Sequence, residues 1–142
     1  MNVTIAKNKN AVLPLVVLSL GLGLILAGCG GESGPPRYEI SGKATFGGQP
    51  IPAGSILFIP DVKSKNKGPR GVATIKDGQY RTVVEQGAVA GPQLVQIAGY
   101  NGIVPPGWSG SRHGAAIFPM YTMNVELPAE TTSIDFNVPA RR

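Results

Sequence analysis

Apolar and polar residues alternate along much of the chain beyond residue 37, with the period of two that a β-strand with one buried face produces. The clearest case is Tyr38–Phe46, where the even-numbered positions hold apolar or small residues and the odd-numbered positions hold polar ones. Ser55–Ile59 is instead a mostly apolar run closed by Pro60, which is typical of a central strand buried on both faces. The pattern therefore predicts a half-buried strand followed by a central one.

A hairpin is predicted next along the chain. Val72–Ile75 and Gln79–Val84 both have strand-like patterns, and they flank the triplet Lys76-Asp77-Gly78. Asp-Gly supplies the positive φ angles that a tight hairpin turn requires, so the two segments are expected to pair.

Three further strands are predicted nearer the C-terminus, at Leu94–Gly99, Met123–Leu127 and Ile134–Val138. Beyond residue 37 no segment repeats its apolar residues at the helical period of 3.6, so almost no helix is expected. The chain also holds 20 glycines and 13 prolines, which suit many turns. Seven short strands of this kind predict an all-β fold, a seven-stranded β-sandwich of immunoglobulin or transthyretin type over residues 38–142.

The first 28 residues have the organisation of an export signal. Lys7 and Lys9 form a short basic start, and an apolar run follows from Ala11 to Leu26. Proline and glycine interrupt this run, which is shorter than the roughly 20 apolar residues of a membrane-spanning helix. We therefore expect a cleaved signal peptide and not a permanent span.

The signal ends in Leu26-Ala27-Gly28-Cys29, which resembles the lipobox of bacterial lipoprotein precursors. The resemblance implies that signal peptidase II cleaves ahead of Cys29, the one cysteine of the chain, and that its thiol carries lipid. Two or more fatty acyl chains, such as palmitate, hold a protein stably on a membrane. Residues 29–37 would form a short tether rich in Gly and Pro, and the domain would face the periplasm or the cell exterior. A free thiol or an intermolecular disulfide is the alternative.

Composition and charge exclude several partners. The chain is 42% hydrophobic, which is too apolar for a disordered protein, and it has a formal net charge of +5. Lys7 and Lys9 leave with the signal, and the remaining charge of +3 is too small to indicate nucleic acid. One histidine, one cysteine and eight scattered acidic residues show no metal-ligand spacing. We expect neither a metal nor another cofactor.

Three segments of the predicted domain are similar to those of a known family. Ile40–Gly54 has a strand, a Gly-containing turn and a link with Pro and Gly to a second strand. Ile75–Tyr80 contains an Asp-Gly-x-Tyr hairpin, and Gly91–Tyr100 places a hydrophobic strand between Gly and Gly-Tyr. Together they resemble carboxypeptidase regulatory-like domains. The resemblance implies a transthyretin-like sandwich and, with the lipobox, one of the small bacterial lipoproteins that have this domain and no assigned activity.

The segment from Asn101 to Phe118 departs from that resemblance, because a shorter connection is expected there. It is rich in Gly and Pro and holds Trp108, Arg112 and the single histidine of the chain, His113. An aromatic side chain with a nearby arginine is typical of binding hot spots, so these three residues form a candidate binding surface for a protein or a sugar. The alternative is that Trp108 covers one end of the sandwich.

A second polar loop is predicted between the central strand and the hairpin. It holds Lys63, Lys65, Lys67 and Arg70 together with Gly68-Pro69. A compact basic patch attracts anionic lipid headgroups or acidic wall polymer. The alternative is a loop whose charges only increase solubility.

The sequence favours a non-enzymatic protein. Gly107-Trp108-Ser109-Gly110 begins like the nucleophile elbow of serine hydrolases, but Ser111 stands where the elbow has Gly. The leading hypothesis is a membrane-anchored envelope lipoprotein that acts as an interaction or structural module. The alternative is a module that binds carbohydrate or cell-wall polymer, and the third possibility is a small hydrolase that depends on His113.

Overall fold

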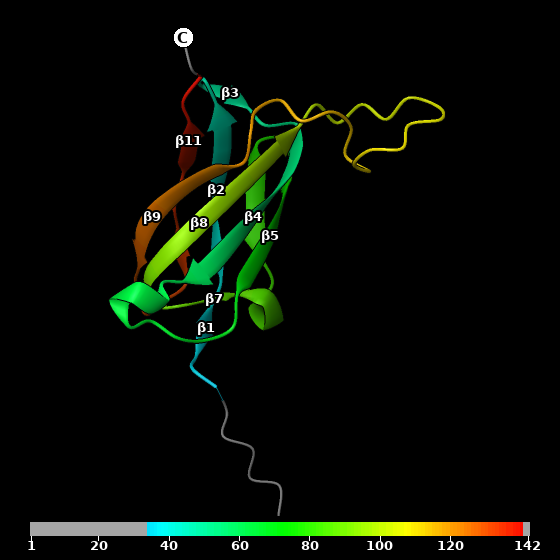
Figure 1. The fold of residues 1–142 in the computed structure, drawn as a ribbon. Coiled ribbons are helices and arrows are strands. Elements are labelled where there is room, and N and C mark those ends of the chain that lie inside the picture. The colour runs from blue at the N-terminus through cyan, green and yellow to red at the C-terminus, as the bar shows by residue number, and fades with distance from the viewer. Residues whose placement is uncertain (1–33, 141–142) are drawn as a thin grey trace, which may run out of the picture. The chain divides into compact units, whose positions relative to one another are not determined.

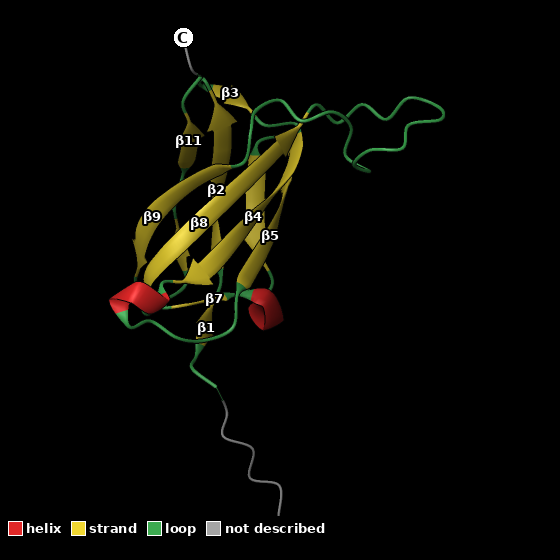
Figure 2. Cartoon of the chain, viewed as in Figure 1, coloured by secondary structure: helices red, strands yellow, loops and turns green. Residues whose placement is uncertain are grey.

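The computed structural model describes residues 34–140, which form eleven β-strands and two short 3₁₀ helices (Figures 1 and 2). The all-β prediction is therefore confirmed. No helix within these residues is long and apolar enough to cross a membrane. The strands are β1 (Arg37–Tyr38), β2 (Ile40–Phe46), β3 (Gln49–Pro50), β4 (Ala53–Pro60), β5 (Gly71–Lys76), β6 (Gln79–Thr82), β7 (Ala88–Val89), β8 (Gly91–Tyr100), β9 (Tyr121–Leu127), β10 (Thr132–Ser133) and β11 (Phe136–Val138), and the helices are η1 (Val62–Ser64) and η2 (Val84–Gln86).

Nine of the strands form one curled sheet in the order β10-β2-β6-β5-β4-β8-β9, and β3 and β11 also pair with β2. Its pairs are antiparallel except that β10 and β11 run parallel to β2. The curl brings β8 and β9 across from β2 and β11, so that one face of the sheet encloses the core (Figure 1). A second, two-stranded sheet joins β1 to β7. The arrangement is consistent with the predicted β-sandwich.

The predicted strand number of seven is wrong, because β1, β3, β7 and β10 are additional strands of two residues each. Two residues are too few to show an alternating pattern. The predicted strand Ile134–Val138 also begins later, at Phe136, and the two preceding residues lie outside the strand although they stay hydrogen-bonded beside β2. There the Ile134 carbonyl accepts a hydrogen bond from the Tyr80 hydroxyl, and the Asp135 side chain accepts one from the Lys43 N–H.

The predicted hairpin is confirmed, and β4 is central as predicted, but only one of its faces is fully buried, since Ser55 is exposed and Leu57 and Ile59 are half-buried. Asp77 and Gly78 have φ angles of 50° and 75°, as expected for the turn between β5 and β6. The second hairpin strand ends at Thr82 and not at residue 84, where η2 has already begun. β4 lies between β5 and β8 and pairs with both along most of its length. The apolar run of β4 and the Asp-Gly turn were therefore sufficient to predict the middle strands of the sheet.

The core is built around aromatic rings contributed by three strands. Phe58 of β4 lies with its ring centroid 6.4 Å from that of Tyr80 of β6 and 6.3 Å from that of Phe136 of β11. Tyr80 and Phe136 stack at 5.6 Å. Because β4 and β11 lie far apart in the strand order, this cluster joins the two sides of the curled sheet. The Tyr80 hydroxyl donates a 2.6 Å hydrogen bond to the Ile134 carbonyl.

The buried phenol of Tyr80 predicts a loss of stability at alkaline pH. Burial, with a smaller effect of the Asp135 charge, raises the pKa of Tyr80 above its ordinary value of 10.0. An unfolded tyrosine ionises near pH 10, whereas the folded one stays neutral, so its contribution is complete below about pH 10 and is lost as pH rises further. The free energy of unfolding, measured by urea denaturation, is expected to fall above about pH 10.

Tyr80→Phe tests this assignment. The variant is expected to lose about 1 kcal/mol at neutral pH, because the hydrogen bond to Ile134 is gone. It is also expected to lose much of the alkaline decline. Tyr121→Phe, which removes a half-buried phenol from β9, is the matched control and should retain the decline. An unchanged decline in Tyr80→Phe would contradict the assignment.

The two ends of the domain differ in what they present. β1, β7 and both 3₁₀ helices lie at one end, where the described chain begins (Figure 2). The connection between β8 and β9 projects sideways from the opposite end, where β3 and β11 also lie (Figure 1). The domain therefore has two separate end surfaces, one formed by β1, β7 and the 3₁₀ helices and the other by the connection between β8 and β9.

Candidate functional site

The connection between β8 and β9, residues 101–120, is irregular but tightly hydrogen-bonded at its base. The Asn101 side-chain oxygen accepts hydrogen bonds from the N–H groups of Ile103 at 3.0 Å and Ala115 at 3.1 Å. The backbone N–H of Asn101 donates to the Ala115 carbonyl at 2.9 Å, and the backbone N–H of Gly102 donates to the His113 backbone carbonyl at 3.0 Å. One asparagine therefore holds the two arms of the loop together.

Ser111 organises the outer part of the loop. Its carbonyl accepts hydrogen bonds from the Trp108 Nε1–H at 2.8 Å and from the Gly114 N–H at 3.0 Å. Its hydroxyl accepts a hydrogen bond from the His113 N–H at 3.1 Å. The indole also lies directly over Gly110, where a Cβ would approach the ring to 2.6 Å. The loop thus has a defined conformation in which Trp108 packs on its own neighbours.

The three predicted surface residues occupy this loop but do not form one patch of touching side chains. Trp108 is 43% exposed and lies outside the core cluster, so the alternative in which it covers the end of the sandwich is wrong. The ring of His113 packs against that of Tyr100 at the end of β8, with centroids 5.8 Å apart. Arg112 is exposed. Trp108 and His113 are connected through Ser111.

Three exposed apolar residues of the loop were not predicted from the sequence. Ile103 is 64% exposed and Val104 is 50% exposed, and Met120 at the far end of the same connection is also exposed. The sequence could have indicated the exposure of Ile103 and Val104, because these two apolar residues precede Pro105 and do not belong to any strand pattern that would bury them. Four of the seven large exposed hydrophobic residues in the described region lie between positions 103 and 120. Apolar surface is therefore concentrated on the projecting loop.

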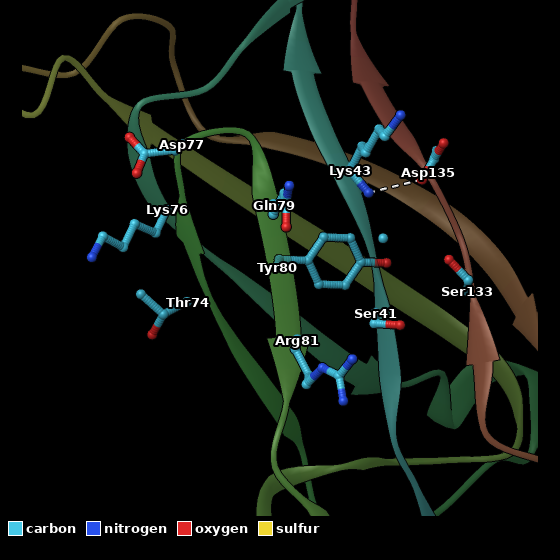
Figure 3. A pocket seen from close by; sticks show the side chains of 11 residues that line it. Ser41, Lys43, Thr74, Lys76, Asp77, Gln79, Tyr80, Arg81, Ser133 and Asp135 are labelled. Carbon is cyan, nitrogen blue, oxygen red and sulfur yellow. Dashed lines mark hydrogen bonds between the residues drawn. The ribbon is translucent and has the colours of Figure 1, made fainter.

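An open polar groove of about 850 Å³ lies on the outer side of β2, β5 and β6 (Figure 3). Lys43, Lys76 and Arg81 contribute cationic groups from these three strands. Arg81 forms a 2.8 Å salt bridge with Glu39. The remaining residues that line the groove are polar or small, apart from Tyr80: Ser41, Gly42, Thr74, Asp77, Gln79, Ser133 and Asp135.

The sequence does not indicate this groove, because its residues are brought together by the register of three strands and not by any pattern of neighbouring residues. Ser41 pairs with Arg81, and Thr74 pairs with Arg81 on its other side, so three separate segments meet there. No cluster of three or more His, Cys, Asp or Glu side chains suited to a metal ion occurs within residues 34–140.

The predicted lipidation site lies outside the described residues. Cys29 and the lipobox residues Leu26, Ala27 and Gly28 precede position 34, where the description begins. Comparison with protein-family models and with curated proteins finds no match to this chain.

Proposed function

We propose that this protein is a lipid-anchored envelope lipoprotein whose β-domain presents the 101–120 loop to a partner protein. Export and lipidation at Cys29 rest on the lipobox, and the domain is assigned to the carboxypeptidase regulatory-like type on its sequence motifs. The proposal depends above all on one observation: a projecting, internally hydrogen-bonded loop carries apolar side chains into solvent.

Such a loop is suited to protein recognition for two physical reasons. Exposed apolar side chains have an unfavourable hydration free energy that contact with a partner removes, and clustered ones mark interaction sites. A loop already fixed by Asn101 and Ser111 loses little conformational entropy on binding. Trp108 and Arg112 add the residue types that are enriched at binding hot spots.

The proposal treats the protein as non-enzymatic. The ring of its single histidine, His113, packs against Tyr100, and the backbone N–H of His113 is the group that bonds to Ser111. A serine hydrolase needs the opposite arrangement, in which the serine hydroxyl donates to the histidine ring.

Cross-linking in intact cells tests the proposal. A photoreactive residue placed at Val104 is expected to give one recurrent protein adduct, whereas the same residue at Thr122, exposed on β9, is expected to give none. Ile103→Ser with Arg112→Ala should weaken binding of that partner about thirtyfold and so reduce its recovery, since each replaced group contributes on the order of 1 kcal/mol. Val72→Ser, an exposed apolar residue of β5, is the matched control and should leave recovery unchanged.

Binding of wall polymer is the second candidate, because the groove in Figure 3 combines three cationic side chains with hydroxyl and amide groups. A photoreactive residue at Gln79 reports on this groove. Adducts with glycan at position 79, together with none at Val104, would replace the leading proposal with a carbohydrate-binding one. Protein adducts at Val104 alone would support the leading proposal.

A further inference from the structure

The basic loop lies beside the point at which the described chain enters the domain. A Cβ on Gly68 would lie 3.0 Å from the Pro35 ring and 2.9 Å from Val89 of β7, so the chain around residue 35 packs on this loop. Lys63, Lys65, Lys67 and Arg70, which we call the basic loop residues, all have exposed side chains. The loop that carries these charges therefore contacts the chain where it enters the domain.

The backbone of the basic loop is held firmly in place. The Asn66 side chain donates hydrogen bonds to the carbonyls of Ala90 at 3.0 Å and Pro92 at 2.8 Å, which flank the start of β8. The Asp61 carboxylate accepts hydrogen bonds from the Lys63 N–H at 3.0 Å and the Ser64 hydroxyl at 2.7 Å. The scaffold fixes the turn, and the basic side chains extend from it into solvent.

The basic loop residues form no salt bridge with any described residue, although Lys63 lies near enough to Asp61 for their charges to interact. The one salt bridge found within residues 34–140 joins Arg81 to Glu39 and involves none of them. Asp61 is used by its own turn, where the Ser64 hydrogen bond lowers its pKa. Glu126 lines a separate hollow with Asp61 and Ser64 on the β9 side of η1. Glu85 on η2 and the exposed Glu130 between β9 and β10 also lie at this end of the domain, and Arg37 donates to the backbone carbonyl of Glu85.

We propose that the basic loop residues bind the anionic headgroups of the membrane that holds the lipid, and so fix the orientation of the domain. The proposal extends the lipid anchor at Cys29 and rests on it. Pro35 lies six positions after Cys29, and a chain of that length spans at most about 20 Å. The loop can therefore reach the surface, within the Debye length of about 8–10 Å over which its charges act.

This orientation also positions the candidate recognition loop. β8 runs from the basic end to the 101–120 loop over ten residues, or about 30 Å at the usual strand rise. With the basic end on the membrane, the apolar loop lies at the far end of the domain and projects sideways, where partners in the surrounding compartment can reach it. Each cation near an anionic surface adds about fivefold to the affinity.

Tryptophan fluorescence tests the orientation, because Trp108 is the only tryptophan of the chain and lies on the distal loop. The lipidated full-length protein is reconstituted in phosphatidylcholine vesicles with or without phosphatidylglycerol and with a dansyl-headgroup lipid as energy acceptor. Wild-type Trp108 is expected to transfer little energy. A Trp108→Phe, Val62→Trp protein, whose probe replaces an exposed residue of η1, is expected to transfer energy strongly when phosphatidylglycerol is present.

Charge variants of the Val62→Trp protein complete the test. Lys63→Gln, Lys67→Gln and Arg70→Gln together are expected to reduce the transfer to the Trp108 level, and Lys43→Gln, Lys76→Gln and Arg112→Gln together are expected to leave it unchanged. Equal transfer from both probes, or transfer independent of phosphatidylglycerol, would overturn the proposal. The proposal would also be overturned if the fluorescence of the tryptophan at position 62 changed on addition of a soluble polyphosphodiester polymer but not on addition of the vesicles.

Failure of this proposal is distinguishable from failure of the lipid anchor. A protein without lipid on Cys29 would be released from every vesicle at high salt. A lipidated protein would stay bound at high salt whether or not the basic loop residues contact the headgroups.

Discussion

Replacing Phe58 with alanine is expected to lower the free energy of unfolding by about 3–5 kcal/mol, a large part of the stability of a small domain. The ring is completely buried on β4 and contacts Tyr80 and Phe136, of which Phe136 lies on β11, far from β4 in the strand order. Its removal leaves a cavity that the surrounding strands fill only in part. Urea denaturation followed by tyrosine and tryptophan fluorescence measures the change.

Val72→Ala is the matched control for Phe58→Ala. Val72 lies on the neighbouring strand β5, but its side chain points outward and is 40% exposed. The expected change is within about 0.5 kcal/mol, as is usual for surface positions. If Phe58→Ala cost as little as Val72→Ala, the aromatic cluster would not be the main link between the two sides of the sheet.

Replacing Cys29 with alanine is expected to abolish lipid attachment and to leave the precursor unprocessed. The thiol is the only group at this position to which a diacylglyceryl chain attaches, and the lipobox resemblance makes lipidation the condition for cleavage. Without acyl chains, whose buried methylenes each contribute about 0.8 kcal/mol, the anchor is lost. Metabolic labelling with a fatty acid and electrophoresis of cell fractions measure both effects.

Ser33→Ala is the control for Cys29→Ala, because it changes the predicted tether and leaves the lipobox intact. It is expected to be labelled and processed like the natural chain. Normal processing of the Cys29→Ala protein, or label retained on it, would contradict the proposed anchor.

The sequence predicted the parts of the fold that short-range rules determine. Alternation identified β2 and β9, and Asp77-Gly78 identified the hairpin, because strand period and turn chemistry are properties of neighbouring residues. The two-residue strands β1 and β10 were missed, since they exist only through pairing with distant partners. The irregular course of residues 101–118 was predicted from their Gly and Pro content.

The candidate surfaces were predicted less completely than the fold. The loop was identified, but its conformation depends on hydrogen bonds from Asn101 and Ser111 that no local pattern indicates. The polar groove was missed because Lys43 and Lys76 become neighbours of Arg81 only through strand register. The basic loop was recognised, whereas its packing against the chain near Pro35 required the three-dimensional structure.

The mass of the natural protein, purified from the membrane fraction, tests the lipid-anchored account most directly. The account predicts a chain that begins at Cys29 and is heavier than the polypeptide of residues 29–142 by a diacylglyceryl group and an amide-linked acyl chain. A chain that still begins at Met1, or one that carries an unmodified Cys29, would contradict it.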